Sequence, residues 1–152
     1  MARLVAAGVT LRRQIDKAFP GRDKRSDGWI ASADHRRRSP VSDHNPDAKG
    51  WVHAIDIDAD LIPWNPRASK KAAQDLANQI VEYAASGKLG CHRIKYVVYN
   101  DRIASGTYAK TWWQWRGKGY GHLHHIHVSF TDVNPVRGRR RFPLPILRRG
   151  KP

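Results

Sequence analysis

Cysteine is almost absent from this chain of 152 residues, which contains Cys91 and no other cysteine. A single cysteine cannot form a disulfide within one chain, and it cannot build a cysteine-based metal cage. A metal site in the monomer must therefore use histidine and carboxylate ligands, and the sequence offers eight histidines and 13 acidic residues.

Long hydrophobic runs are also lacking. Residues 1–11 contain a short apolar run that Gly8 interrupts, and neither a long apolar region nor a small-residue cleavage site follows it. We therefore expect no secretory signal peptide, and no segment is apolar for long enough to predict a membrane span. If the protein acts outside the cytoplasm, another agent must release it there.

Acidic residues are few beside the basic ones: 13 Asp and Glu stand against 28 Lys and Arg, which gives a formal net charge of +15. Such a charge attracts polyanions without specifying which one. Nucleic acid, anionic cell-wall polymers and phospholipid head groups all satisfy this condition. The charge predicts a binding preference and no particular reaction.

The length predicts a single domain with its own core. Apolar spacing predicts one helix over residues 10–19 and a longer helix that begins after Asn65 and ends before Gly87. Residues 51–58, 94–100 and 124–130 are expected to be strands. These elements predict an α+β fold, with a small antiparallel sheet and helices packed on one face.

Two segments have no hydrophobic periodicity. Residues 21–50 contain many Gly and Pro residues and are expected to be irregular. Residues 137–152 contain seven Arg or Lys and three Pro. We expect the folded domain to cover residues 1–136, with an extended basic tail at residues 137–152.

Two of the expected strands carry polar residues on one face. Alternation places Asp56 and Asp58 on the same face of the first strand, and His125 and His127 on one face of the last. An inward-facing carboxylate or imidazole is costly unless it is paired or bound to a metal. The pattern therefore indicates a polar site between these strands.

The residues suited to metal binding are His44 in a loop, Asp56 in one strand and His127 in another. Catalytic zinc commonly takes three ligands from His and Asp or Glu and leaves a fourth position for water. Three alternatives remain open at this point. A lone loop histidine is usually a surface residue, Asp58 could replace Asp56, and the histidine-rich segment from His122 could be a coincidence.

Three short segments resemble the signature blocks of the lysostaphin-type and D-Ala-D-Ala metallopeptidase superfamily. They are Ser42-Asp43-His44, Ala54-Ile55-Asp56 and His125-Ile126-His127. The spacing of His122, His125 and His127 is further similar to that of the penicillin-insensitive murein endopeptidases. The resemblance implies one zinc ion (Zn²⁺) bound by His44, Asp56 and His127, with His125 beside it.

The resemblance also implies a function, namely zinc-dependent hydrolysis of peptide bonds in the stem or cross-link peptides of bacterial peptidoglycan. Many relatives have a glutamate where this chain has His124, so His122 or His125 is expected to act as the general acid and base. Arg38 lies where relatives often carry a substrate-binding arginine, although residues 36–38 are also typical of a solvated basic surface.

A phage endolysin or tail-associated lysin fits these expectations. Such a bacteriophage protein is made in the host cytoplasm and degrades the cell wall after release through a holin, or as part of a virion, and its basic surface would suit anionic wall polymers. The peptidoglycan bond that is cut, the oligomeric state and the host stay open.

Two other functions fit part of the pattern. A metal-dependent nuclease of the His-Asn-His type would also contain an Asp43-His44 pair, a later histidine cluster and a basic surface for nucleic acid. That nuclease presents its last histidines on a helix, whereas residues 124–130 alternate as a strand, which favours the peptidase. The third candidate is an inactive wall-binding component of a virion.

Overall fold

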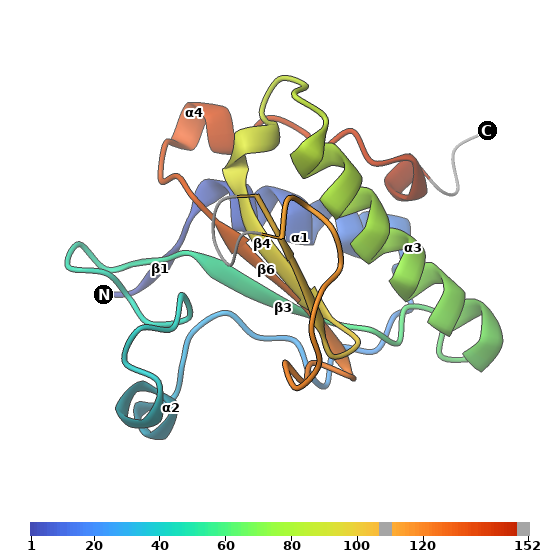
Figure 1. Ribbon diagram of the computed structural model, residues 1–152, viewed down its shortest axis with the longest axis horizontal. Helices are drawn as coiled ribbons and strands as arrows, with labels where there is room; N and C mark the ends of the chain where they lie inside the picture. The colour runs from blue at the N-terminus through green and yellow to red at the C-terminus, as the bar shows by residue number, and fades with distance from the viewer. Residues whose placement is uncertain (107–110, 149–152) are drawn as a thin grey trace.

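The computed structural model describes residues 1–106 and 111–148, and it has the expected single α+β domain (Figure 1). In chain order the elements are β1 (Arg3–Leu4), α1 (Ala6–Ala18), α2 (Ala33–Arg38), β2 (Trp51–Val52), β3 (Ala54–Asp58), α3 (Pro66–Ala85), η1 (Cys91–Arg93), β4 (Ile94–Tyr99), β5 (Arg102–Ser105), β6 (His125–Phe130), α4 (Pro135–Gly138) and η3 (Pro145–Arg148).

The main sheet has four antiparallel strands in the order β3-β6-β4-β5. The last strand in the chain, β6, therefore lies between β3 and β4. Its residue His127 is opposite Asp56 of β3 and opposite Val98 of β4. The strand β5 was not predicted. It forms a hairpin with β4 through Asn100 and Asp101, both of which have positive φ angles, as a tight hairpin turn requires.

The two faces of the sheet differ in chemistry because side chains alternate along each strand. On one face, apolar side chains of β3, β4 and β6 join a single buried core with α1 and α3. Both helices thus cover the same face, as predicted. The opposite face of the β3–β6 ladder carries the paired residues Asp56 and His127, and next to them Asp58 and His125.

The two long helices form where apolar spacing predicted them. In α3, the side chain of Asn65 accepts a hydrogen bond from the backbone N–H of Ala68, and Pro66 occupies the first turn. Leu76 and Ile80 on its inner side are buried. The first helix, α1, begins at Ala6, earlier than expected, because residues before position 10 also pack against the core.

A buried arginine organises the segment that follows α1. The side chain of Arg22 has no exposed surface and forms ion pairs with Asp16 at 2.7 Å and Asp27 at 2.5 Å. Asp27 in turn accepts a hydrogen bond from the backbone N–H of Asp58 at 2.7 Å. Gly28 then pairs with Asp56 through two backbone hydrogen bonds. This segment is therefore fixed along the edge of β3.

The expectation that residues 21–50 are irregular is wrong for one short part. Residues 33–38 form the helix α2, because the Ser32 hydroxyl accepts a hydrogen bond from the N–H of His35 at 3.1 Å and so caps the first turn. No residue of α2 is buried. The helix lies apart from α1 and α3, at the lower left of Figure 1, and it therefore lacked the apolar stripe that would have predicted it.

The expectation of an extended tail at residues 137–152 is wrong for residues 137–148, while residues 149–152 lie outside the described part. Four apolar side chains of this segment belong to the core: Phe142, Leu144, Ile146 and Leu147. Gly138 packs so closely on α1 that an added Cβ would come within 2.6 Å of the Ala6 side chain. The boundary expected at residue 136 therefore does not separate a domain from a tail.

Arg93 holds this C-terminal segment in place. Its side chain is fully buried, and its guanidinium donates hydrogen bonds to the carbonyl oxygens of Gly90, Arg137 and Arg140. The guanidinium carbon also lies 3.8 Å from the centre of the Phe142 ring. A buried charge is tolerated only when its donors are satisfied, and here backbone carbonyls and the Tyr83 hydroxyl accept from the guanidinium.

We expect Phe142→Ala to lower the free energy of unfolding by about 3–5 kcal/mol, the usual cost of removing a buried phenylalanine ring. Chemical denaturation followed by circular dichroism measures this change. The matched control is Val136→Ala, because Val136 is 75% exposed and lies in α4, directly before this segment. Equal stability of the two variants would show that the segment contributes nothing to the core.

Candidate metal centre

His44 lies in a loop that several contacts hold against the sheet. The neighbouring carboxylate of Asp43 accepts hydrogen bonds from Lys95 Nζ of β4 at 2.9 and 3.1 Å. The backbone carbonyl of His44 accepts a hydrogen bond from Ala31 N–H at 3.0 Å. Its ring atom Nδ1 lies 2.9 Å from the carbonyl oxygen of Trp29. The position and the orientation of the imidazole are both fixed.

The hydrogen bond to Trp29 also fixes the protonation of the His44 ring. A carbonyl oxygen can only accept, so Nδ1 carries the proton, and Nε2 has a free lone pair when the ring is neutral. Partners of this kind commonly orient a metal-binding histidine. The free Nε2 faces Asp56, whose Oδ1 lies 3.2 Å away.

Asp56 and His127 come together because they are directly opposite in the β3–β6 ladder. Asp56 Oδ1 lies 3.1 Å from His127 Nδ1. On the other side of the ring, His127 Nε2 lies 2.7 Å from the hydroxyl oxygen of Ser129. The ring is stacked on Tyr96, with 5.3 Å between ring centres and 17° between planes. His127 therefore has a defined orientation.

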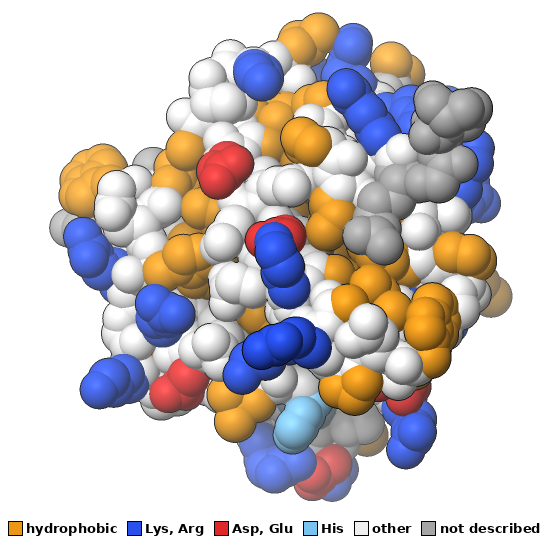
Figure 2. Space-filling view, turned by 90° about the vertical axis from the view of Figure 1, so that its right-hand side faces the viewer, with side chains coloured by type: hydrophobic (Ala, Val, Ile, Leu, Met, Phe, Trp, Pro, Cys, Tyr) orange, Lys and Arg blue, Asp and Glu red, His pale blue; other side chains and the backbone are white. Residues whose placement is uncertain are grey.

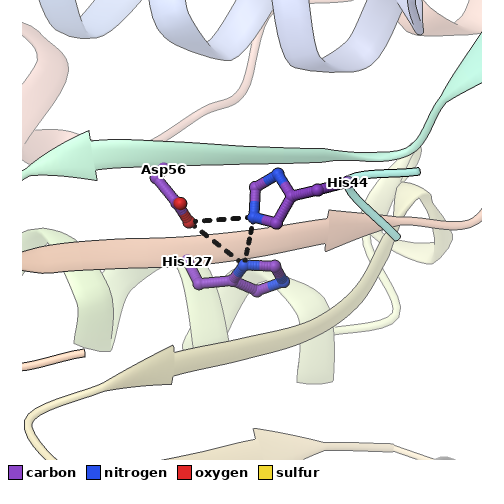
Figure 3. A group of neighbouring side chains, drawn as sticks. All are labelled: His44, Asp56 and His127. Carbon is purple, nitrogen blue, oxygen red and sulfur yellow. Dashed lines mark hydrogen bonds and ion pairs between the residues drawn. The ribbon is translucent and has the colours of Figure 1, made fainter. Parts of the chain in front are cut away.

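The three predicted ligands converge on one point. Besides the two contacts of Asp56, His44 Nε2 lies 3.1 Å from His127 Nδ1. Figure 3 shows the three side chains pointing toward one another, His44 from its loop and the others from adjacent strands. Their ligand atoms are close enough for one metal ion to contact all three.

The chemistry of these atoms favours a cation at the centre. An ionised carboxylate only accepts hydrogen bonds, and so does Nε2 of a neutral His44 ring. Two acceptors 3.2 Å apart repel each other unless a proton or a metal ion lies between them. The site therefore has a place for positive charge.

The shifted pKa values agree with this description. Burial by itself would raise the pKa of Asp56, but hydrogen bonds and charge from His127 and His44 outweigh it and hold that pKa far below its usual range. Burial would lower the pKa of His44, yet the bond and charge of Asp56 raise it overall. Burial lowers the pKa of His127. Without a metal, the proton therefore resides on His44.

The structure distinguishes Asp56 from Asp58, which the sequence left open. Asp58 is buried, and its carboxylate accepts hydrogen bonds from the backbone N–H groups of Ser26 and Asp60 and from the Ser26 hydroxyl. Those bonds help lower the pKa of Asp58, although burial opposes them. Asp58 stabilises a turn, and Asp56 is the carboxylate that meets the two histidines.

His125 and His122 lie next to this centre. His125 Nε2 is 3.7 Å from Asp56 Oδ2, the carboxylate oxygen that the other two histidines do not contact at hydrogen-bond distance. The ring of His122 lies 4.7 Å from the ring of His125 and 5.4 Å from that of His127, centre to centre. Both residues expected to move protons therefore border the three candidate ligands.

Arg38 is not brought to this group by any contact within the described residues. Its side chain is 75% exposed and pairs with Asp34 at 2.6 Å, one turn earlier in α2. This exposed side chain fits the alternative interpretation of the sequence, in which residues 36–38 form a solvated basic surface. Its role in substrate binding stays a prediction.

Sequence reasoning missed the partners that hold the ligands. The contact of Trp29 is made by its backbone carbonyl, which the amino-acid sequence cannot indicate. Lys95 is one of many basic residues, so the sequence pattern did not single it out. Tyr96 was expected only as part of a strand. Ser129 had a usable signal, because it shares the alternating face of His127.

Comparisons of the chain with protein-family models, curated proteins and solved structures give no match. Within the described residues, no helix combines the length and the apolar character that crossing a bilayer requires. The arrangement of the side chains themselves is therefore the basis for any statement about function.

Because the proton on His44 must leave before a metal ion can bind, we expect metal affinity to rise with pH. Its raised pKa means that the proton stays bound to a higher pH than on an ordinary histidine. The apparent affinity for Co²⁺ should change by about tenfold per pH unit below that pKa and level off above it. Calorimetric titrations in buffers of different ionisation heat measure the released proton.

The matched control for this titration is His53→Gln. His53 pairs with Asp47 at 2.9 Å and is not among the three candidate ligands, so its substitution should leave proton release unchanged. An affinity that does not depend on pH would show that His44 is not a ligand.

Proposed function

We propose that this protein is a zinc-dependent peptidase that hydrolyses peptide bonds of bacterial peptidoglycan. The observation that carries the proposal is the convergence of His44, Asp56 and His127 on one point, with His122 and His125 beside it. Two imidazoles and one carboxylate form a common ligand set of catalytic zinc.

The spacing of the ligand atoms supports zinc. Ligands at zinc-to-nitrogen and zinc-to-oxygen distances of about 2.0–2.1 Å in a tetrahedron lie roughly 3.4 Å from one another. The three separations here are 3.1, 3.1 and 3.2 Å. The side chains of His44 and Asp56 are 12% and 20% exposed. Solvent and substrate could therefore reach the fourth corner.

A zinc ion held there would polarise a peptide carbonyl and lower the pKa of a water molecule to about 7. The chain's own residues must then move the proton. Burial lowers the pKa of His125, so its ring is neutral and able to accept a proton near neutral pH. His122 Nδ1 donates to the carbonyl of Tyr120 at 2.7 Å, which leaves Nε2 as an acceptor.

A cavity of about 1080 Å³ lies beside the ends of β3 and β6, and neither the three candidate ligands nor His122 or His125 line it. It is lined in part by Asp58 and His124, which continue the strands beyond Asp56 and His125. Two cations on α3, Arg67 and Lys70, also line it, and within the described residues no acidic side chain pairs with either. Four aspartates line it as well (Asp23, Asp58, Asp60 and Asp75), so its charge does not select an anionic peptide, and it is no part of the proposed centre.

The basic surface supports adsorption to an anionic polymer. Figure 2 shows Lys and Arg side chains spread over the face on the right of Figure 1, with few acidic side chains between them. The net charge of +15 would concentrate the protein on wall polymers that carry phosphate or carboxylate groups. We infer that a phage lysin, released into the wall or carried in a virion, would use this attraction.

The positive net charge would also suit a nuclease, because nucleic acid is a polyanion. Against it, the last two histidines of the cluster lie on the strand β6 instead of a helix. That arrangement differs from the His-Asn-His motif, and it favours the peptidase.

The direct test uses the full chain loaded with one equivalent of Zn²⁺ and purified peptidoglycan of known structure. We expect new free amino groups, and mass spectrometry of the released fragments will identify the bond that is cut. A chelator should stop the release, and added zinc should restore it. Cleavage of DNA without release of wall fragments would favour the nuclease.

His127→Ala should lose both bound zinc and hydrolysis while keeping its circular dichroism spectrum, because one of three ligands is removed. The matched control is His124→Ala, which removes an exposed histidine three residues away. Hydrolysis that persists in the His127→Ala variant would reject the proposed centre.

His125→Gln should lower kcat by about 10²–10⁴ while one equivalent of zinc stays bound, since general acid–base catalysis contributes on this scale. Zinc content by elemental analysis separates this effect from loss of the metal. The control is His124→Gln in the same cluster. If His125→Gln keeps full kcat, proton transfer belongs to another residue.

A further inference from the structure

Asp56 belongs to two groups of potential metal ligands. The first is the centre already described. In the second, ligand atoms of Asp56, His122 and His125 all lie within 4.8 Å of one another. Asp56 Oδ1 faces His44 and His127, whereas Asp56 Oδ2 lies 3.7 Å from His125 Nε2. The two oxygens of this carboxylate thus have different histidine neighbours, and Oδ2 is the one that lies toward His125.

Hydrogen bonds with Asp101 and Asn100 hold the loop that carries His122 in place. The carboxylate of Asp101 accepts hydrogen bonds from the N–H groups of Gly119 and Gly121, both at 2.9 Å. Asn100 N–H donates to the carbonyl of His122 at 3.1 Å. His122 itself has a φ of +59°, a strained conformation for a non-glycine residue that persists only when its surroundings impose it.

We propose that Asp56 bridges two cation positions, and that His122 and His125 bind a second divalent ion such as Zn²⁺ or Co²⁺. Two ions about 3.5–4 Å apart, joined by shared ligands, are a known arrangement in metallohydrolases. Imidazole nitrogen together with a carboxylate oxygen suits these ions better than Mg²⁺ or Ca²⁺, which take mainly oxygen ligands.

The second position binds its ion more weakly than the first. The separation of 3.7 Å between His125 and Asp56 is longer than the 3.1–3.2 Å separations in the first group, so the side chains must move to reach one ion. His122 comes from a loop, and a neighbouring cation repels the incoming ion. The first position therefore fills before the second.

Occupation of the second position inhibits the enzyme. This part of the inference rests on the proposed function, in which His122 and His125 move protons. A metal ion uses the same nitrogen lone pairs that would accept those protons. Excess zinc therefore removes the general base while the first ion stays in place.

The test is the number of Zn²⁺ ions that the full chain binds, measured by calorimetry and by elemental analysis after equilibrium dialysis at rising zinc concentration. We expect one equivalent at low zinc and two at higher zinc. His122→Ala should keep the first equivalent and lose the second. His124→Ala, the matched control, should keep both.

Two outcomes overturn the inference. One is a wild-type protein that never binds more than one equivalent. The other is a second equivalent that survives in His122→Ala or disappears in His124→Ala, because the ion would then lie elsewhere. Both outcomes are measured by zinc binding alone, so they test the second site whether or not the protein cleaves peptidoglycan.

Co²⁺ tests whether Asp56 is shared. Two Co²⁺ ions bridged by one carboxylate couple magnetically, so the electron paramagnetic resonance signal of the first ion should weaken when the second binds. Simple addition of the two signals would reject the bridge.

If peptidoglycan hydrolysis is observed, the second equivalent of Zn²⁺ should reduce kcat by roughly 10²-fold or more, and unchanged kcat would reject the inhibitory role.

Discussion

The candidate centre depends on the register between β3 and β6. Direct pairing of Asp56 with His127 places a carboxylate and an imidazole side by side on a half-buried face. A shift of β3 by one residue would turn Asp56 toward the apolar core, where an unpaired charge is very costly. The core prevents such a shift, because the intervening residues Ile57, Ile126 and Val128 fill the opposite face. Packing on one side of the sheet thus specifies the chemistry on the other.

The candidate ligand His44 requires a second constraint, because it lies in a loop outside the sheet. Gly28 pairs with Asp56 at the free edge of β3, and this brings the Trp29 carbonyl close enough to accept a hydrogen bond from Nδ1–H of the His44 ring. The ion pair of Asp43 with Lys95 ties the same loop to β4. Contacts with β3 and β4, the two neighbours of β6, therefore determine where His44 lies, and neither depends on a bound metal.

The sequence predicted those parts of the fold that have a simple period. Alternation along residues 124–130 identified the face of His127 because every second side chain of a strand points the same way. The same rule could not separate Asp56 from Asp58, which share that face. The difference arises from donors in a distant loop, such as Ser26, and no local pattern contains them. The short helix α2 escaped prediction because it buries no residue.

The C-terminal segment shows how charge can conceal a core element. Its arginines suggested a solvated tail, yet apolar residues such as Phe142 and Leu144 alternate with exposed ones and reach the core. The backbone carbonyls of Arg137 and Arg140 bond to buried Arg93, while their own residues are exposed. These arginines therefore extend from a fixed backbone. A polyanion that binds them meets cations whose backbone is already ordered, and less conformational entropy is lost than with a disordered tail.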